Sequence, residues 1–238
     1  MPQADPQLHN PNRILAALAP EEYARLAPFL SHQETLPRGL VLEPRQEPTT
    51  FIYFPWSGVC SLTTVTLDGR VVEVGTIGNE GIVGMTAFFG GQLTDLETVV
   101  QVAGCGASVM RTGAFVAEME RRGPLYLLTQ RYSQALLSFM TRSIACNALH
   151  DVHARCARWL LLTHDRVGGD TFGLTQDYLA AMLGVRRSTV TLIARDLQKR
   201  GLIRYRRGEV TILRRRGLER SACECYAIVR GYFDRLVP

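Results

Sequence analysis

The stretch Leu174–Ile203 decides the fold and reads LTQDYLAAMLGVRRSTVTLIARDLQKRGLI. It predicts two short helices joined by a tight turn. Thr175 is a good N-cap for the first helix, and Gly184 follows that helix at a position where a positive φ would be costly for other residues. The second helix ends at Gly201, directly after two basic residues. A helix, a glycine turn and a second helix in this order are typical of a helix-turn-helix.

The second helix is predicted to bury one face and expose the other. Helical spacing assigns four residues to the core: Val190, Ile193, Ala194 and Leu197. Arginine suits guanine edges, hydroxyl groups suit bases or phosphates, and leucine suits the thymine methyl group. We therefore predict that the opposite face is the recognition face of a helix in the major groove of DNA. The predicted base-reading residues are Arg187, Ser188, Thr191 and Leu192, and Arg195 on the same face is predicted to contact phosphate.

The segment that follows, residues 203–213, reads as a β-hairpin with an arginine-rich tip. Arg206 and Arg207 at this tip are predicted to contact backbone phosphates beside the groove. The hairpin would complete a winged helix.

Charge is distributed unevenly along the chain. Residues 1–150 contain 10 Arg and 13 acidic residues, whereas residues 151–238 contain 17 basic residues, of which 16 are Arg, and 9 acidic residues. An acidic first part joined to a strongly basic second part suggests two domains, of which the second meets a polyanion. A solvated basic face would give the same counts, so charge alone leaves both interpretations open.

Upstream, residues 35–111 alternate short apolar runs with glycine-type turns, which predicts an antiparallel barrel or sandwich. Residues 124–149 then change to a helical period with two adjacent apolar stripes. One stripe can pack on the chain's own barrel and the other on a partner helix, although a single wide stripe facing the core is the alternative. We assign dimerisation to Leu128, Tyr132, Ala135 and Phe139.

With helices, barrel, long helix and winged helix in this order, the chain resembles the Crp/Fnr family of bacterial transcription regulators. The helix-turn-helix and the stretch Asp151–Arg155 carry the resemblance most specifically. It implies an α+β fold with three parts: a jelly roll or β-barrel like a cyclic-nucleotide-binding domain (1–123), a long dimerisation helix (124–150) and a C-terminal winged helix-turn-helix domain that ends in a helix (151–238). We place this terminal helix at Gly217–Leu236. The resemblance also implies a homodimer that binds a two-fold symmetric operator in double-stranded DNA and contacts RNA polymerase.

The resemblance also carries over to individual positions. Arg187, Ser188 and Leu192 fall where the family reads bases, and Thr175 and Thr189 fall where it contacts phosphate. Arg186 replaces the small N-cap residue that is usual in the family, and we count it among the phosphate contacts.

The predicted sensor part departs from the family's cyclic-nucleotide pocket. Met85 takes the place of the glutamate that holds the ribose, and Asp95 and Glu97 lie where a cation would hold the phosphate. An anion buried beside acidic groups is strongly disfavoured. We place the effector pocket at Gly84, Met85, Asp95, Glu97 and Thr98, and expect an effector other than cyclic AMP.

No cofactor is assigned from the sequence. An iron–sulfur cluster of the family's type needs clustered thiolates, and residues 1–59 contain no cysteine. A haem would need an axial ligand among residues that are more often core or surface: Cys60, Cys105, His32 and Tyr53. Two further groups have side chains that could bind a metal ion: His150 with His153 and Cys156, and Cys223 with Cys225. For both, the sequence favours structural roles, and no metal site is assigned.

An enzyme is not expected either. The sequence has no nucleophile elbow, P-loop or dinucleotide fingerprint, and residues 34–148 contain no histidine for a cupin-type metal site. Apolar runs are too short to span a bilayer, and a secretory signal is absent, which predicts a cytoplasmic protein without a membrane partner. Residues 1–12 are expected to form a loose arm.

Overall fold

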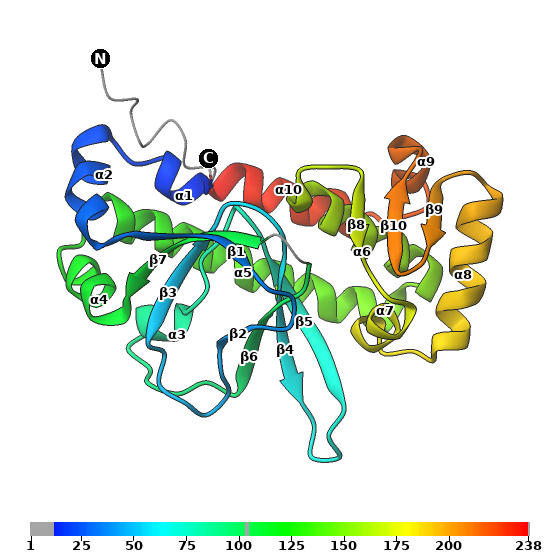
Figure 1. Cartoon of the computed structure of the whole chain (residues 1–238), viewed down its shortest axis with the longest axis horizontal. Coiled ribbons are helices and arrows are strands. Elements are labelled where there is room, and N and C mark those ends of the chain that lie inside the picture. The colour runs from blue at the N-terminus through cyan, green and yellow to red at the C-terminus, as the bar shows by residue number, and fades with distance from the viewer. Residues whose placement is uncertain (1–11, 103–104, 238) are drawn as a thin grey trace.

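A computed structural model describes residues 12–102 and 105–237 (Figure 1). The predicted N-terminal arm lies outside these residues except for Asn12. Asn12 is buried and caps helix α1 (Arg13–Ala16), because its side-chain oxygen accepts hydrogen bonds from the amides of Ile14 and Leu15. Its side-chain amide donates to the carbonyls of Pro55 and Gly81. The chain is thus fixed to the sensor part from its first described residue.

Two antiparallel sheets form the sensor part. Their strands are β1 (Ser31–Leu36), β2 (Val41–Glu43), β3 (Phe51–Pro55), β4 (Cys60–Val65), β5 (Val71–Ile77), β6 (Leu96–Val100) and β7 (Cys105–Arg111). One sheet has the order β1-β7-β3 and the other β2-β6-β4-β5. Within the described ranges the sheets are not closed into a barrel, so the jelly-roll alternative of the prediction holds and the barrel does not. A hairpin with Asp68 and Gly69 in its turn joins β4 to β5, and Gly69 has φ 81°.

Short helices flank these sheets. They are α2 (Pro20–Leu26), the 3₁₀ turn η2 (Ala27–Phe29), α3 (Met85–Phe88) and α4 (Thr112–Glu120). Glu21 and Glu22 in the first turn of α2 interact favourably with the positive end of its helix dipole.

The long helix α5 spans Pro124–Leu149, the predicted bounds. It connects the sheets at one end of the molecule to the winged helix at the other (Figure 1). Helix α6 (Val152–Val167) begins directly afterwards, with Asp151 accepting the amide of Ala154 as its N-cap. It ends at Gly168, which adopts the left-handed conformation with φ 68°.

The winged helix follows the prediction closely. It comprises β8 (Thr171–Gly173), α7 (Gln176–Leu183), α8 (Arg187–Lys199), β9 (Ile203–Arg206) and β10 (Glu209–Ile212), and its sheet has the order β8-β10-β9. Strand β8 was not predicted, because three residues are too few for a periodic signal.

The single terminal helix predicted for Gly217–Leu236 is wrong. The structure has α9 (Arg215–Glu219) and α10 (Cys225–Leu236), separated by a turn. The break lets α10 run back along α5, where the ring of Phe233 lies 6.4 Å from that of Tyr132 and 6.1 Å from that of Phe139. The C-terminus therefore returns to α1 (Figure 1), and Arg13 donates a hydrogen bond to the carbonyl of Phe233.

This packing corrects the dimerisation assignment. Leu128, Tyr132, Ala135 and Phe139 are at most 7% exposed within one chain. The Tyr132 hydroxyl donates to the carbonyl of Ile82 in the sensor part. The four residues therefore belong to the core beneath the sensor part and α10. The assignment was wrong because amphipathic spacing predicts a buried stripe but does not show whether the same chain or a partner covers it. The exposed apolar side chains of the helix include Leu137 and Ile144, at 65% and 71%.

Candidate nucleic-acid interface and sensor cavity

Local capping builds the helix-turn-helix. The Thr175 hydroxyl accepts the amide of Tyr178 and starts α7, and Gly184 ends it with φ 66°. Arg186 is the N-cap of α8 with an extended backbone and no side-chain cap bond, as the sequence indicated. Thr175 and Arg186 are both exposed, whereas Thr189 is half-buried in the first turn of α8. The N-terminus of α8 has the positive end of its helix dipole, which favours a phosphate.

Helix α8 presents the predicted face to solvent. Its core residues Val190, Ile193, Ala194 and Leu197 are at most 8% exposed. On the opposite side Arg187, Ser188, Leu192 and Arg195 are all exposed. Thr191 differs: it is half-buried, and its hydroxyl lies 2.7 Å from the side-chain oxygen of Gln176 in α7. That contact joins the two helices, so Thr191 is less available to a base than the other four residues.

Arg187 has an ionic neighbour in α7. Its Nε lies 3.5 Å from the carboxylate of Asp177, and both side chains are about two-thirds exposed. Exposed pairs of this kind contribute less than about 1 kcal/mol, so the guanidinium can exchange this partner for a base edge.

The wing is held against α8. Its turn consists of Arg207 and Gly208, with consecutive positive φ values of 52° and 79°. The amide of Tyr205 donates to the side chain of Gln198 in α8, and the Tyr205 hydroxyl donates to the carbonyl of Leu174. Arg206 and Arg207 therefore extend, exposed, from a hairpin that is fixed relative to the recognition helix.

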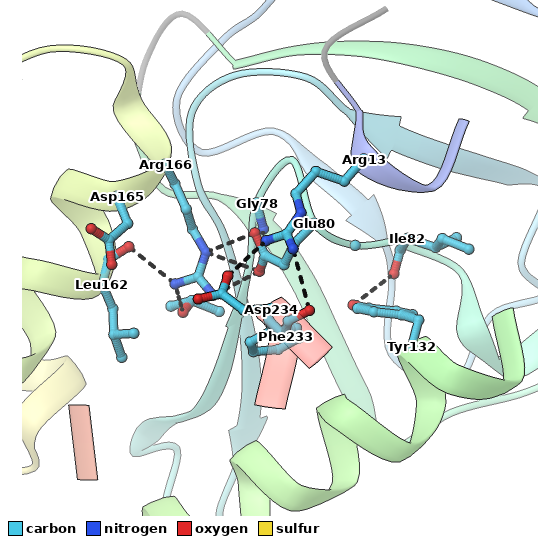
Figure 2. Close-up of polar contacts among 12 residues, drawn as sticks. Arg13, Gly78, Glu80, Ile82, Tyr132, Leu162, Asp165, Arg166, Phe233 and Asp234 are labelled. Atoms are coloured by element: carbon cyan, nitrogen blue, oxygen red, sulfur yellow. Dashed lines mark hydrogen bonds and ion pairs between the residues drawn. The ribbon is translucent and has the colours of Figure 1, made fainter. Parts of the chain in front are cut away.

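A buried ion pair joins the sensor part to helix α6 (Figure 2). Nη2 of Arg166 lies 2.7 Å from the carboxylate of Glu80, and both side chains are about 5% exposed. Arg166 also donates to the hydroxyl of Thr76. Burial opposes the charge of Glu80, but attraction and hydrogen bonds from Arg166 outweigh it and hold the pKa of Glu80 below its ordinary value. No pattern in the sequence predicts a role for either residue.

A second polar contact lies beside it. The carboxylate of Glu73 in β5 accepts hydrogen bonds from the Trp159 indole at 2.8 Å and from the Ser61 hydroxyl at 2.7 Å. Ser61 also lies 2.9 Å from the hydroxyl of Tyr178 in α7. Burial raises the pKa of Glu73 to about 7 despite the two hydrogen bonds, which act in the opposite direction. The sheet β2-β6-β4-β5 is therefore linked to both α6 and α7.

The sensor part contains a mainly apolar cavity of about 390 Å³ that is partly open to solvent. Gly84 and Met85 line it as predicted, but Asp95, Glu97 and Thr98 do not. The side chain of Asp95 is exposed and accepts from Gln46, and Thr98 donates to the carboxylate of Glu43. The pocket assignment is thus corrected in part: among the described residues, the charged side chain in the lining is Glu43, which is buried and also accepts from Thr49.

Leu136 and Met140 of α5 complete the wall of this cavity. No lining residue among the described ranges is basic, and none of the four candidate haem ligands lines it. The sulfur atoms of two of these candidates, Cys60 and Cys105, lie 3.8 Å apart in the core.

The candidate metal ligands are regrouped by the fold. His153 lies 2.8 Å from a carboxylate oxygen of Asp196, and Cys156 is buried in the winged-helix core. His150 instead lies with Cys223 and Cys225, and Cys146 joins them. In the sequence these residues form separate groups, because the approach of α10 to α5 has no local signal.

Comparisons with known proteins agree with this architecture. Residues 154–221 match the family model of the Crp-like helix-turn-helix domain. A search of curated proteins found no significant match. The fold is similar to the c-di-GMP-responsive global regulator CLP of Xanthomonas campestris, at 18% identity and a TM-score of 0.63, covering 82% of this chain and 99% of that one. It is also similar to a CRP-family transcriptional regulator of Thermus thermophilus, at 21% identity and a TM-score of 0.64, covering 80% and 96%.

The chain therefore joins a jelly roll, the part predicted to sense a signal, to a winged helix-turn-helix. Residues 154–221 thus resemble a Crp-like helix-turn-helix domain, and the chain as a whole has the fold of the Crp/Fnr regulators, as the sequence predicted. Within the described residues no helix is long and apolar enough to cross a membrane.

Proposed function

We propose that this protein is a cytoplasmic transcription regulator that binds a two-fold symmetric DNA operator as a homodimer, and that a signal in the sensor cavity other than cyclic AMP controls it. One observation carries the proposal: the recognition face of α8 and the tip of the wing are both exposed and basic, and hydrogen bonds hold them in one unit. No catalytic role is proposed.

The two basic surfaces have different tasks. Arg187, Ser188 and Leu192 read bases in the major groove, and Thr191 orients α8 on α7 besides any base contact. Phosphate contacts come from residues that surround this face: Thr175, Arg186, Thr189, Arg195, Arg206 and Arg207. Thr175 can serve both purposes, since its oxygen caps α7 while its hydroxyl hydrogen remains available to a phosphate.

The dimer forms through the part of α5 that its own chain leaves uncovered. Leu137 and Ile144 are seven residues apart, so they lie on one side of the helix at the spacing of a coiled-coil seam. Met140 lies between them in sequence and also lines the sensor cavity. A ligand in the cavity therefore contacts the helix that pairs the two subunits.

The chemistry of the cavity limits which ligands can bind there as the signal. Its apolar wall and the buried Glu43 suit an apolar ligand with a hydrogen-bond donor or positive charge. A cyclic phosphate would face a carboxylate, with no basic residue in the described lining. For the same reason, the c-di-GMP response of the Xanthomonas regulator is not extended to this chain. Contact with RNA polymerase stays a prediction.

Selection of bound sequences from a random DNA pool tests the function. We expect the full chain to enrich a palindrome whose half-sites lie about one helical turn apart. A matched control combines Arg187→Ala, Arg206→Ala and Arg207→Ala, which leaves the core of the winged helix unchanged and should enrich nothing. Enrichment of unrelated, asymmetric sequences by the wild-type chain would contradict the proposal.

A further inference from the structure

Four metal-binding side chains converge where α5 meets α10. Cys146 lies in the last turns of α5, His150 ends that helix, and Cys223 and Cys225 flank the start of α10. Their ligand atoms all lie within 4.8 Å of one another. The three cysteine side chains are at most 9% exposed, and all three are free thiols.

The dimensions fit one tetrahedral ion. Zinc binds sulfur at about 2.3 Å and imidazole nitrogen at about 2.0–2.1 Å, so neighbouring ligand atoms of a tetrahedron lie about 3.5–3.8 Å apart. Here the sulfur atoms of Cys146 and Cys223 are 3.5 Å apart, and the Cys225 sulfur lies 3.6 Å from Nδ1 of His150. In an iron–sulfur cluster, cysteine sulfur atoms that bind different iron atoms would lie farther apart than these.

The outer contacts point to the same chemistry. Nδ1 of His150 faces the sulfur atoms, while its Nε2 lies 3.2 Å from the carboxylate of Glu224. Metal-bound histidines commonly donate their second ring N–H to a carboxylate, which fixes the ring orientation. Glu224, the N-cap of α10, lies in the sequence between Cys223 and Cys225, so one short segment supplies two ligands and the carboxylate.

A buried positive charge lies beside the cluster. Arg158 is 9% exposed, has long contacts to the Ser143 hydroxyl at 3.3 and 3.4 Å, and its Nε has no hydrogen-bond partner among the described residues. No ion pair involves it within the described part of the chain. Its guanidinium interacts electrostatically with the sulfur atoms of Cys146 and Cys225. Arg158 also attracts the carboxylate of Glu73. Three thiolates and a divalent cation sum to one negative charge, which would place a further counter-charge beside Arg158.

We propose that Cys146, His150, Cys223 and Cys225 bind one divalent metal ion of the zinc class in a Cys₃His site. The site ties the C-terminal helix to the end of α5, one residue before the N-cap of α6. Metal binding therefore fixes the junction between the sensor part and the winged helix. This inference stands on the four ligands alone and does not depend on DNA binding.

Metal content and cobalt spectroscopy test the site. The full chain, reduced and freed of metal by a chelator, is titrated with Co²⁺ and then with Zn²⁺. We expect one equivalent per chain, with the sulfur-to-cobalt charge-transfer band and intense visible bands of a tetrahedral site, both lost when Zn²⁺ displaces cobalt. Cys223→Ser and His150→Ala should lose stoichiometric binding, and Cys156→Ala is the matched control that should retain it. Glu224→Gln leaves all four ligands and should weaken zinc binding roughly 10- to 100-fold in competition with a chelator.

Several results would overturn the proposal. These are no cobalt or zinc bound by a reduced chain with native circular dichroism, full binding in both ligand variants, iron–sulfur absorption in the purified protein, or a Cys146–Cys223 disulfide that persists in reductant. If Cys223→Ser fails to fold, His150→Ala decides the outcome, because His150 is a partly exposed residue outside the helix interior.

Discussion

Arg166 of α6 and Glu80 of the sensor part form an ion pair across the boundary between the two parts of the molecule, and both side chains are buried (Figure 2). Arg166 also fills the space beside Gly78, where an added Cβ would lie 2.4 Å from its Cδ. The pair therefore sets how closely α6 approaches the end of strand β5 at Ile77.

Removing one member of this pair should destabilise the fold strongly. We expect Glu80→Gln or Arg166→Met alone to lower the free energy of unfolding by about 3–5 kcal/mol, because each leaves a buried charge unpaired. The double variant should recover much of this loss. Asp68→Asn in the exposed Asp68–Arg70 pair is the control and should leave the free energy of unfolding nearly unchanged. Urea denaturation of the wild-type chain and the four variants measures these values, and additive single effects would contradict the coupling.

The raised pKa of Glu73 predicts that the free energy of unfolding falls as the pH rises toward and past neutrality. Its pKa of about 7 is raised, so the folded state keeps a proton that the unfolded state loses near its ordinary pKa of about 4.3. The associated stability is fully present below about pH 4.3 and is lost as pH rises through about 7, by up to about 3 kcal/mol. Glu73→Gln should flatten this part of the profile of unfolding free energy against pH.

Urea denaturation of wild type and Glu73→Gln between pH 5 and 8.5 checks this dependence. Subtracting the two profiles removes the common contribution of histidines, and Trp159 fluorescence reports the ionisation at the site. An unchanged slope in Glu73→Gln would contradict the assignment.

Local signals account for what the sequence predicted, and contacts between distant residues account for what it missed. Caps, a glycine turn and helical spacing fixed the winged helix and the bounds of α5. Glu80 and Arg166 are separated by 86 positions, so no pattern could pair them. The return of α10 likewise has no local signal, and it explains both the wrong dimerisation residues and the unpredicted meeting of Cys146 with Cys223. Gly84 and Met85 of the predicted effector pocket line a cavity, whereas Glu43 was not predicted to line it, because its strand is only three residues long.

Cyclic AMP should not bind. Among its described lining residues, the cavity offers a cyclic phosphate the carboxylate of Glu43 and no basic side chain. Calorimetry with cyclic AMP and cyclic GMP should show no saturable heat below about 10 µM, the range that corresponds to roughly −7 kcal/mol. A saturable titration in that range would show that the pocket assignment is mistaken.

The dimer should depend on Ile144 and Leu137. Glu at either position places a charge in the proposed seam between paired α5 helices, and we expect light scattering to shift from twice the chain mass to the chain mass. Leu127→Glu changes an exposed leucine on another side of the same helix and should leave the dimer intact. Dimers that persist in Ile144→Glu, or dissociate equally in Leu127→Glu, would exclude this seam.

The recognition helix and the wing should differ in what they contribute to DNA binding. Arg187→Ala should cost about 1–3 kcal/mol on the selected operator and relax the preference at one position in each half-site, because it removes a contact to a base edge. Arg206→Ala and Arg207→Ala should weaken all sequences about equally, and each should reduce the slope of log affinity against log salt by about one. Affinities of the three variants for the operator and for scrambled DNA, measured across a salt series, separate the two effects.

Asp177→Asn removes the ionic neighbour of Arg187 and should leave sequence preference unchanged. If Asp177→Asn reproduces Arg187→Ala, the arginine acts through that pair; if Arg187→Ala behaves like the wing variants, another part of α8 reads the bases.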